Sequence, residues 1–243
     1  MSAAALARRR SLITMPTLST TRSQLDRGLA IIRDDVLRLG SQVESHIEWS
    51  VHALRGHDLG LARRVVDGDA RIGSLRFKIE TECLDCLATQ QPTARDLRSL
   101  LAAMHMAGEL ERMADHAKGV AGISFRSHEM PESVSMTTLV RMQVAACKML
   151  HLSMDAYVRE DEALARMAAD QDVGIDELYL LAVRQALDEA RTHNGWLELA
   201  TYCVWTAHNL ERIGDRVTNV CERVLFLVTG ELGDYAPNQP IRA

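Results

Sequence analysis

The chain has 243 residues, of which 47% are hydrophobic and 25% are charged, with a formal net charge of −5 at pH 7. This composition supports a folded core and excludes a disordered polymer, while the acidic balance argues against non-specific binding of nucleic acid. No apolar run approaches the roughly 20 residues that a membrane-spanning helix needs. Aromatic residues make up only 4%, which favours helices over strands.

The location of the protein is predicted from its N-terminus and its cysteines. Arg8, Arg9 and Arg10 form a basic cluster, but no apolar stretch of signal-peptide length follows them. Five cysteines are an odd number for a disulfide framework. Cys83 and Cys86 form a CxxC within an apolar helical pattern, which indicates packing rather than a zinc site. We therefore predict a cytoplasmic protein.

Three helices are predicted in the first half of the chain. In the first helix, apolar residues recur with spacings of four and three, which is typical of a helix packed in a bundle: Leu25, Leu29, Ile32, Val36, Leu39 and Val43. The sequence RGHD at 55–58 ends it, and a second helix follows over about 58–90 until QQP at 90–92. Thr93 begins a third helix, which extends to about residue 126.

The second half repeats this plan after a polar connection at 125–133. Helices are predicted over 133–160 and 161–192, and a last one over 196–230 follows the turn HNG at 193–195. No proline lies between 132 and 236, so long helices are permitted.

The two halves align with each other. VDGDARIGSL at 66–75 matches ADQDVGIDEL at 169–178, and LERMAD at 110–115 matches LERIGD at 210–215. A repeat of this length indicates duplication of a three-helix unit. We predict an all-α fold of two tandem antiparallel three-helix bundles related by this internal repeat. The expected divisions are a disordered tail (1–16), the first repeat (17–127), the second repeat (132–232) and a C-terminal tail (233–243).

Paired carboxylates recur at the same place in both repeats. Glu111 and Asp115 are four residues apart and share a helix face, and so do Glu211 and Asp215. The preceding helix adds Asp69 in the first repeat, and Asp172 and Asp176 in the second. If neighbouring helices bring these acids together, two charges about 8 Å apart repel by about 2 kcal/mol at an effective dielectric of about 20.

A bound multivalent cation is the neutraliser that this pattern favours. Arg112 and Arg212 each follow a glutamate directly and are expected to point about 100° away around the helix. Ligand sets made only of oxygen suit Mg²⁺, Mn²⁺, Ca²⁺ or ferric iron.

The two candidate metal sites are unequal. The second repeat offers a ladder of five possible ligands: Asp172, Asp176, Glu211, Asp215 and Asn219. In the first repeat, Gly73 stands in place of Asp176 and Gly119 in place of Asn219. We therefore expect the second site to bind metal more tightly.

Three segments resemble the PhoU family of bacterial regulators of phosphate uptake and phosphate-starvation signalling. They are ARRVVDGD (62–69), QQPTARDLRSLLAAMHMAGELERMADHA (90–117) and NLERIGDRVTNVCE (209–222), and the resemblance extends over about 20–232. It implies two three-helix bundles, and multinuclear iron or zinc bound through the E(D)xxxD motif. Glu111 with Asp115, Glu211 with Asp215, and Asp172 with Asp176 match that motif. Asp69 matches half of it, since Gly73 cannot be a ligand.

The resemblance also implies a role and partners. It implies a cytoplasmic homodimer that contacts the ATPase of a phosphate ABC transporter and a phosphate sensor histidine kinase. In that role the protein damps both transport and kinase output when phosphate is sufficient, and it performs no catalysis.

Two other interpretations remain. A di-iron carboxylate oxidase would need Glu-x-x-His, but no glutamate of the chain has a histidine three residues later. A structural helical scaffold without metal would carry the same acids as a solvated face. Core packing is expected for Trp196 and Trp205 in the last helix, with a dimer or partner contact at one of them as the alternative.

Overall fold

The computed structural model describes residues 18–127 and 133–235, and all the elements in them are helices. The first three are α1 (Leu18–Gly56), α2 (Leu59–Thr89) and α3 (Ala94–Ile123). The others are α4 (Val134–Arg159), α5 (Glu162–Ala169), α6 (Asp172–Thr192) and α7 (Leu197–Thr229). The predicted all-α fold is confirmed. Residues 1–16 and 236–243 of the two expected tails lie outside the described residues.

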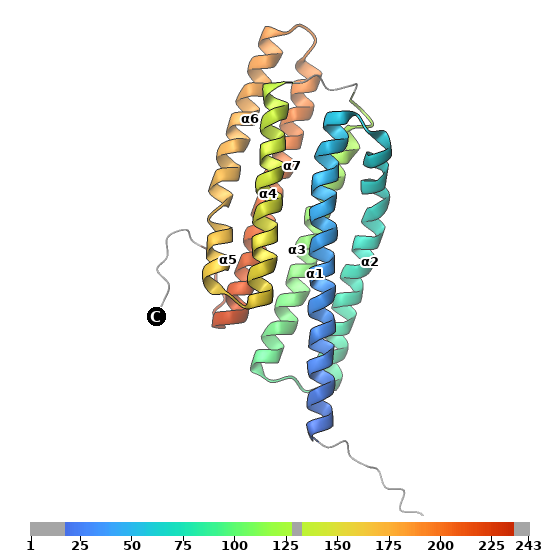
Figure 1. The fold of residues 1–243 in the computed structure, drawn as a ribbon, viewed down its shortest axis with the longest axis vertical. Coiled ribbons are helices and arrows are strands. Elements are labelled where there is room, and N and C mark those ends of the chain that lie inside the picture. Colours follow the sequence, from blue (N-terminus) through green and yellow to red (C-terminus); the bar gives the residue numbers. More distant parts are fainter. Residues whose placement is uncertain (1–17, 128–132, 236–243) are drawn as a thin grey trace, which may run out of the picture.

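Two bundles stand side by side, as Figure 1 shows: α1, α2 and α3 form one, and α4 to α7 form the other. α3 and α7 run antiparallel to each other where the bundles meet, and α1 also contacts α4. The 4-3 apolar seam of α1 is buried as predicted, with Val36, Leu39 and Val43 fully inaccessible. One continuous hydrophobic core includes residues of all seven helices, so the two bundles stabilise each other.

The repeat is visible in atomic detail at a spacing of 103 residues. Asp58 accepts a hydrogen bond from the third residue after it and caps α2, and Asp161 does the same for α5. Buried Ser50 and Ser153 each donate to the carbonyl three residues earlier. This register holds for the first two helices of the repeat, whereas the acidic motifs of α3 and α7 align at a spacing of 100 residues, as Glu111 and Glu211 do.

The expectation of one continuous helix over 161–192 is wrong. The chain makes a tight turn at Asp170 and Gln171, where the Gln171 amide donates to Ala168 and the Gly174 amide donates to Gln171. These bonds span three residues instead of four and tighten the backbone locally. As a result, Asp172 becomes the first residue of a new helix, α6.

None of the helices in the described part of the chain has the length and the apolar character that crossing a membrane requires.

Candidate functional site

Four acids of the second bundle gather between α6 and α7. Asp172 and Asp176 lie one turn apart at the start of α6, and Glu211 and Asp215 lie one turn apart on α7. Burial raises the pKa of Asp172 to about 6, and Asp176, Asp215 and Glu211 act in the same direction, against a hydrogen bond from Thr218. The tertiary structure therefore brings together the four carboxylates that the sequence predicted.

The pKa values of two other members of this cluster also move upward. Burial followed by the charge of Asp215 raises the pKa of Asp176. Burial, then Asp215, raises the pKa of Glu211, while His208 and Arg212 oppose the shift. Asp172, Asp176 and Glu211 thus have raised pKa values, first because burial disfavours the charged form and then because the neighbouring carboxylates repel it.

Two carboxylate oxygens in this cluster are buried without a hydrogen-bond partner: Asp172 Oδ1 and Glu211 Oε2. Asp172 Oδ1 lies so close to the backbone of α7 that a Cβ built on Gly214 would come within 2.6 Å of it. Gly214 therefore makes room for the carboxylate. Unsatisfied buried oxygens are costly, and a cation that binds here would satisfy them.

The expectation that Arg212 points away from the acids is wrong. Its Nη1 lies 2.7 Å from Asp215 Oδ2, since residues three apart on a helix are neighbours and a long side chain reaches along the face. His208 Nδ1 lies 3.4 Å from Glu211 Oε2. Arg212 therefore offsets part of the charge, whereas Asp172 has no ion-pair partner in the described residues.

Within residues 18–127 and 133–235, no three side chains of the His, Cys, Asp and Glu types are arranged so that they could hold a metal ion. The acids of the second bundle are gathered but not aligned as ligands. Their donor set is made of carboxylate oxygens, two of which accept no hydrogen bond, and such oxygens are the ligands that hard cations take.

The first bundle differs at the equivalent place. Lys118 Nζ forms an ion pair with Asp69, at 2.5 Å from its Oδ2. The residue equivalent to Lys118 in the second bundle is Thr218, which carries no charge. Glu111 is partly buried, Asp115 is exposed, and open space surrounds Gly73. A lysine therefore supplies the counter-charge that the sequence pattern assigned to a metal, and this arrangement does not fit a metal ion.

Asn219 does not join the four acids of the second bundle. Its amide donates to Glu109 Oε2 of α3 at 3.0 Å, and Arg216 approaches the same oxygen at 3.4 Å. The symmetric contact on the other side of the repeat joins His116 Nδ1 and Asn209 Oδ1 at 3.1 Å. These contacts hold α3 against α7 where the two bundles meet.

The sequence reasoning missed Glu109, Lys118 and Thr218. Lys118 was detectable in principle, because it lies three residues after Asp115 and therefore on the same helix face. The pairing of Lys118 with Asp69 could not be predicted from the sequence, because Asp69 lies 49 residues away on another helix.

Comparisons with known proteins agree with this architecture. The family model described as "PhoU domain" matches twice, at 36–123 and 139–224. The phosphate-specific transport system accessory protein PhoU of Serratia marcescens is 32% identical over 86% of both chains. That of Escherichia coli strain K12 is 30% identical over 86% of both.

Two crystal structures have the same fold. The phosphate transport system regulatory protein PhoU from Streptococcus pneumoniae superposes with a TM-score of 0.80 at 27% identity, covering 87% of this chain and 100% of its own. PhoU from Pseudomonas aeruginosa superposes with a TM-score of 0.79 at 31% identity, covering 85% of this chain and 99% of its own.

Proposed function

Since the chain belongs to the PhoU family, we propose that it is a regulatory accessory protein of phosphate transport and not an enzyme. The observation that carries this proposal is the length of the similarity, which includes both repeats and most of each relative. A match of this extent includes the residues on the surfaces of both bundles as well as those in the shared core.

The finer role is that of a cytoplasmic, homodimeric adaptor. It contacts the ATPase of a phosphate ABC transporter and a sensor histidine kinase, and it lowers the output of both when phosphate is sufficient. An adaptor acts through surfaces, and the described residues contain one with suitable chemistry. A hollow of about 820 Å³ between α2, α3 and α7 is bordered by Phe125 and Trp205.

The expectation that Trp205 packs in the core is wrong, because its side chain is 49% exposed. Phe125 beside it is 40% exposed. Exposed aromatic residues around a hollow are typical anchors of protein interfaces. They support a docking surface on this face of the molecule.

Metal binding is proposed for the second bundle. Asp172, Asp176, Glu211 and Asp215 would hold the ion, which would balance their charge and fix α6 against α7. The family resemblance favours iron or zinc, and the oxygen ligands also suit Mg²⁺, Mn²⁺ or Ca²⁺. Asp172 Oδ1 and Glu211 Oε2, which are buried and accept no hydrogen bond, support this proposal.

The regulatory role is tested by complementation in an Escherichia coli strain without its own PhoU. The chain is expected to restore repression of a phosphate-starvation reporter in phosphate-rich medium, and to retain the transporter ATPase and the kinase in pull-down experiments. Trp205→Ser should weaken that retention, while Trp196→Ser, at the N-cap of α7 and outside the hollow, serves as the control. Absence of both repression and retention would contradict the role.

The metal proposal is tested separately. Protein purified without chelator is analysed for bound metals and titrated with Mn²⁺ and Fe³⁺ by calorimetry. Glu211→Gln should lose most of the binding and Glu111→Gln little of it. Metal-free protein that takes up neither ion would favour the structural scaffold, and equal losses would contradict the asymmetry.

A further inference from the structure

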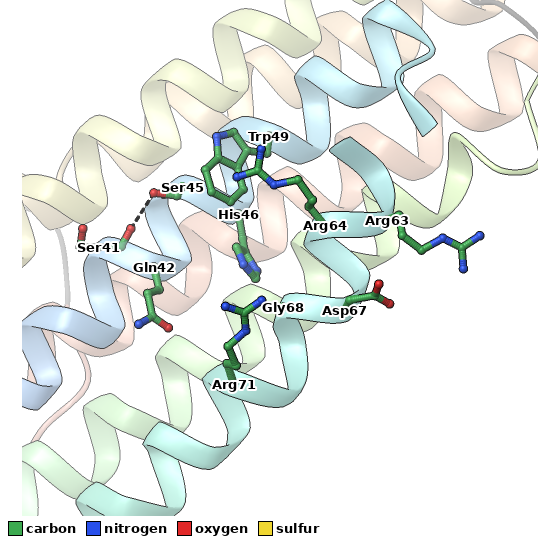
Figure 2. Close-up of a pocket in the computed structure, with 10 residues that line it drawn as sticks. All are labelled: Ser41, Gln42, Ser45, His46, Trp49, Arg63, Arg64, Asp67, Gly68 and Arg71. Atoms are coloured by element: carbon green, nitrogen blue, oxygen red, sulfur yellow. Dashed lines mark hydrogen bonds between the residues drawn. The ribbon is translucent and has the colours of Figure 1, made fainter. Parts of the chain in front are cut away.

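A pocket of about 440 Å³ lies between α1 and α2, on a part of the first bundle that the carboxylate site does not use. Figure 2 shows the side chains of His46 and Trp49 from α1 opposite those of Arg64 and Arg71 from α2. Gln42 also borders the pocket. This volume is within the range of small-molecule sites.

Two guanidinium groups in the pocket lack a carboxylate partner in the described part of the chain. Arg64 lies over the indole ring of Trp49, with its central carbon 4.6 Å from the ring centroid. That contact holds the group in place by a cation–π interaction while its N–H groups stay available. Arg71 lies on the same face of α2, two turns further on, and forms no ion pair in residues 18–127 and 133–235.

His46 forms the floor of the pocket and is only 7% exposed. Its Nδ1 is buried and has no hydrogen-bond partner. The ring lies against the backbone of α2, where a Cβ on Gly68 would come within 2.7 Å of it. Burial lowers the pKa of His46, as does the nearby Arg71, against the effect of Asp69. The buried imidazole, with its Nδ1 unused, is therefore exposed to the negative charge of Asp69 as well as to the positive charge of Arg71.

The other two charged residues at the pocket contribute less to its interior. Figure 2 shows the side chains of Arg63 and Asp67 extending away from His46. Arg63 lies over the ring of Phe125 instead, 5.2 Å from its centroid. Arg64 and Arg71 are therefore the two cationic side chains of the pocket that extend toward its interior.

The internal repeat places different residues at the equivalent positions of the second bundle. At a spacing of 103, the counterparts of His46 and Trp49 are Met149 and Leu152, which pack in the core of the second bundle or against it. The counterparts of Arg64 and Arg71 are Met167 and Gly174. In the second bundle, where the chain turns between α5 and α6 at Asp170 and Gln171, none of these four positions carries a polar or charged side chain. The cationic pocket therefore has no counterpart at the equivalent place.

We propose that the pocket between α1 and α2 binds a tetrahedral oxyanion, either inorganic phosphate or the phosphoryl group of a small molecule. Arg64 and Arg71 would donate paired N–H groups to its oxygens, as guanidinium groups do for phosphate. Gln42 and His46 offer further polar contacts. This proposal goes beyond the role in transport regulation and does not depend on the metal site.

Calorimetric titration of the full chain tests it, with inorganic phosphate, glycerol phosphate and ATP as separate ligands. A chelator keeps the carboxylate cluster free of metal, and potassium chloride keeps the ionic strength constant. Arg71→Gln and Arg64→Gln should each weaken binding about tenfold or more, because each removes charge-assisted hydrogen bonds. Arg63→Gln is the matched control, since it removes the same charge from the position next to Arg64. Its affinity for each ligand should stay within about twofold of that of the wild type.

The ligand arms identify the source of the anion. Binding of phosphate assigns the free ion, and binding of ATP or glycerol phosphate alone assigns a phosphorylated small molecule; both support the site. Absence of binding in all three arms would overturn the proposal. So would an equal loss in Arg63→Gln and Arg71→Gln, which would indicate diffuse attraction to surface charge. Thermal unfolding of each variant verifies that the fold is intact.

Discussion

Replacing Asp172 by asparagine should stabilise the metal-free protein at neutral and alkaline pH. Asp172 has its pKa raised from 3.8 to about 6, chiefly by burial and by the acids around it. A carboxyl whose pKa is raised by folding binds its proton more tightly in the folded state. Its contribution to stability is therefore complete below the unfolded pKa and is lost as the pH rises through the folded value. The asparagine side chain carries no charge and avoids this loss.

The size of the effect follows from the shift. Each pKa unit corresponds to about 1.4 kcal/mol, so the shift of Asp172 sets an upper bound of about 3 kcal/mol. Solvent screening at this half-buried side chain reduces the figure to about 1–2 kcal/mol. The variant also loses the favourable interaction of a charge with the N-terminus of α6, worth about 0.5 kcal/mol. A net gain of about 1 kcal/mol is expected.

Urea unfolding followed by far-ultraviolet circular dichroism, with a chelator present, measures this gain. The difference between Asp172→Asn and the wild type should grow between pH 3.8 and about 6 and then remain constant. Asp69→Asn is the matched control, because it removes the equivalent carboxyl, which forms an ion pair with Lys118. Its stability should be unchanged or lower. A variant at position 172 that is no more stable than the wild type at about pH 8, above the raised pKa, would refute the reasoning.

Three further predictions concern substitutions elsewhere in the chain. Gly73→Asp combined with Lys118→Thr should give the first bundle the acids of the second and create Mn²⁺ binding, measured by calorimetry; Gly73→Asp alone should not, because the lysine still balances the charge. Gly68→Ala should lower the thermal unfolding temperature, since its Cβ would press against the ring of His46. Gly73→Ala, where nothing lies within 4 Å, should raise stability by up to about 1 kcal/mol through helix propensity. A Gly68→Ala variant more stable than Gly73→Ala would contradict the close packing of His46 on Gly68. Asp161→Ala should destabilise the protein by about 1 kcal/mol in urea unfolding, because α5 loses its N-terminal cap; an unchanged midpoint would show that the cap contributes nothing.

The sequence by itself determined the helices, their duplication and the faces on which the acids lie. These are local properties: a helix has 3.6 residues per turn, so the spacing of Val36, Leu39 and Val43 identifies a buried face, and that of Glu211 and Asp215 places both carboxylates on one side. The spacing of 103 residues between the halves was equally readable, and the capping residues Asp58 and Asp161 obey it.

Only the tertiary structure decided which side chain meets which. The ion pair of Asp69 with Lys118, the contact of Asn219 with Glu109 and the position of Arg71 near His46 all join different helices. Such contacts depend on how far each helix rotates and slides against its neighbours, and the packing of the whole core sets both quantities. The periodicity of one segment carries no information about them. For this reason the sequence pattern suggested a metal at a place where the structure has a lysine.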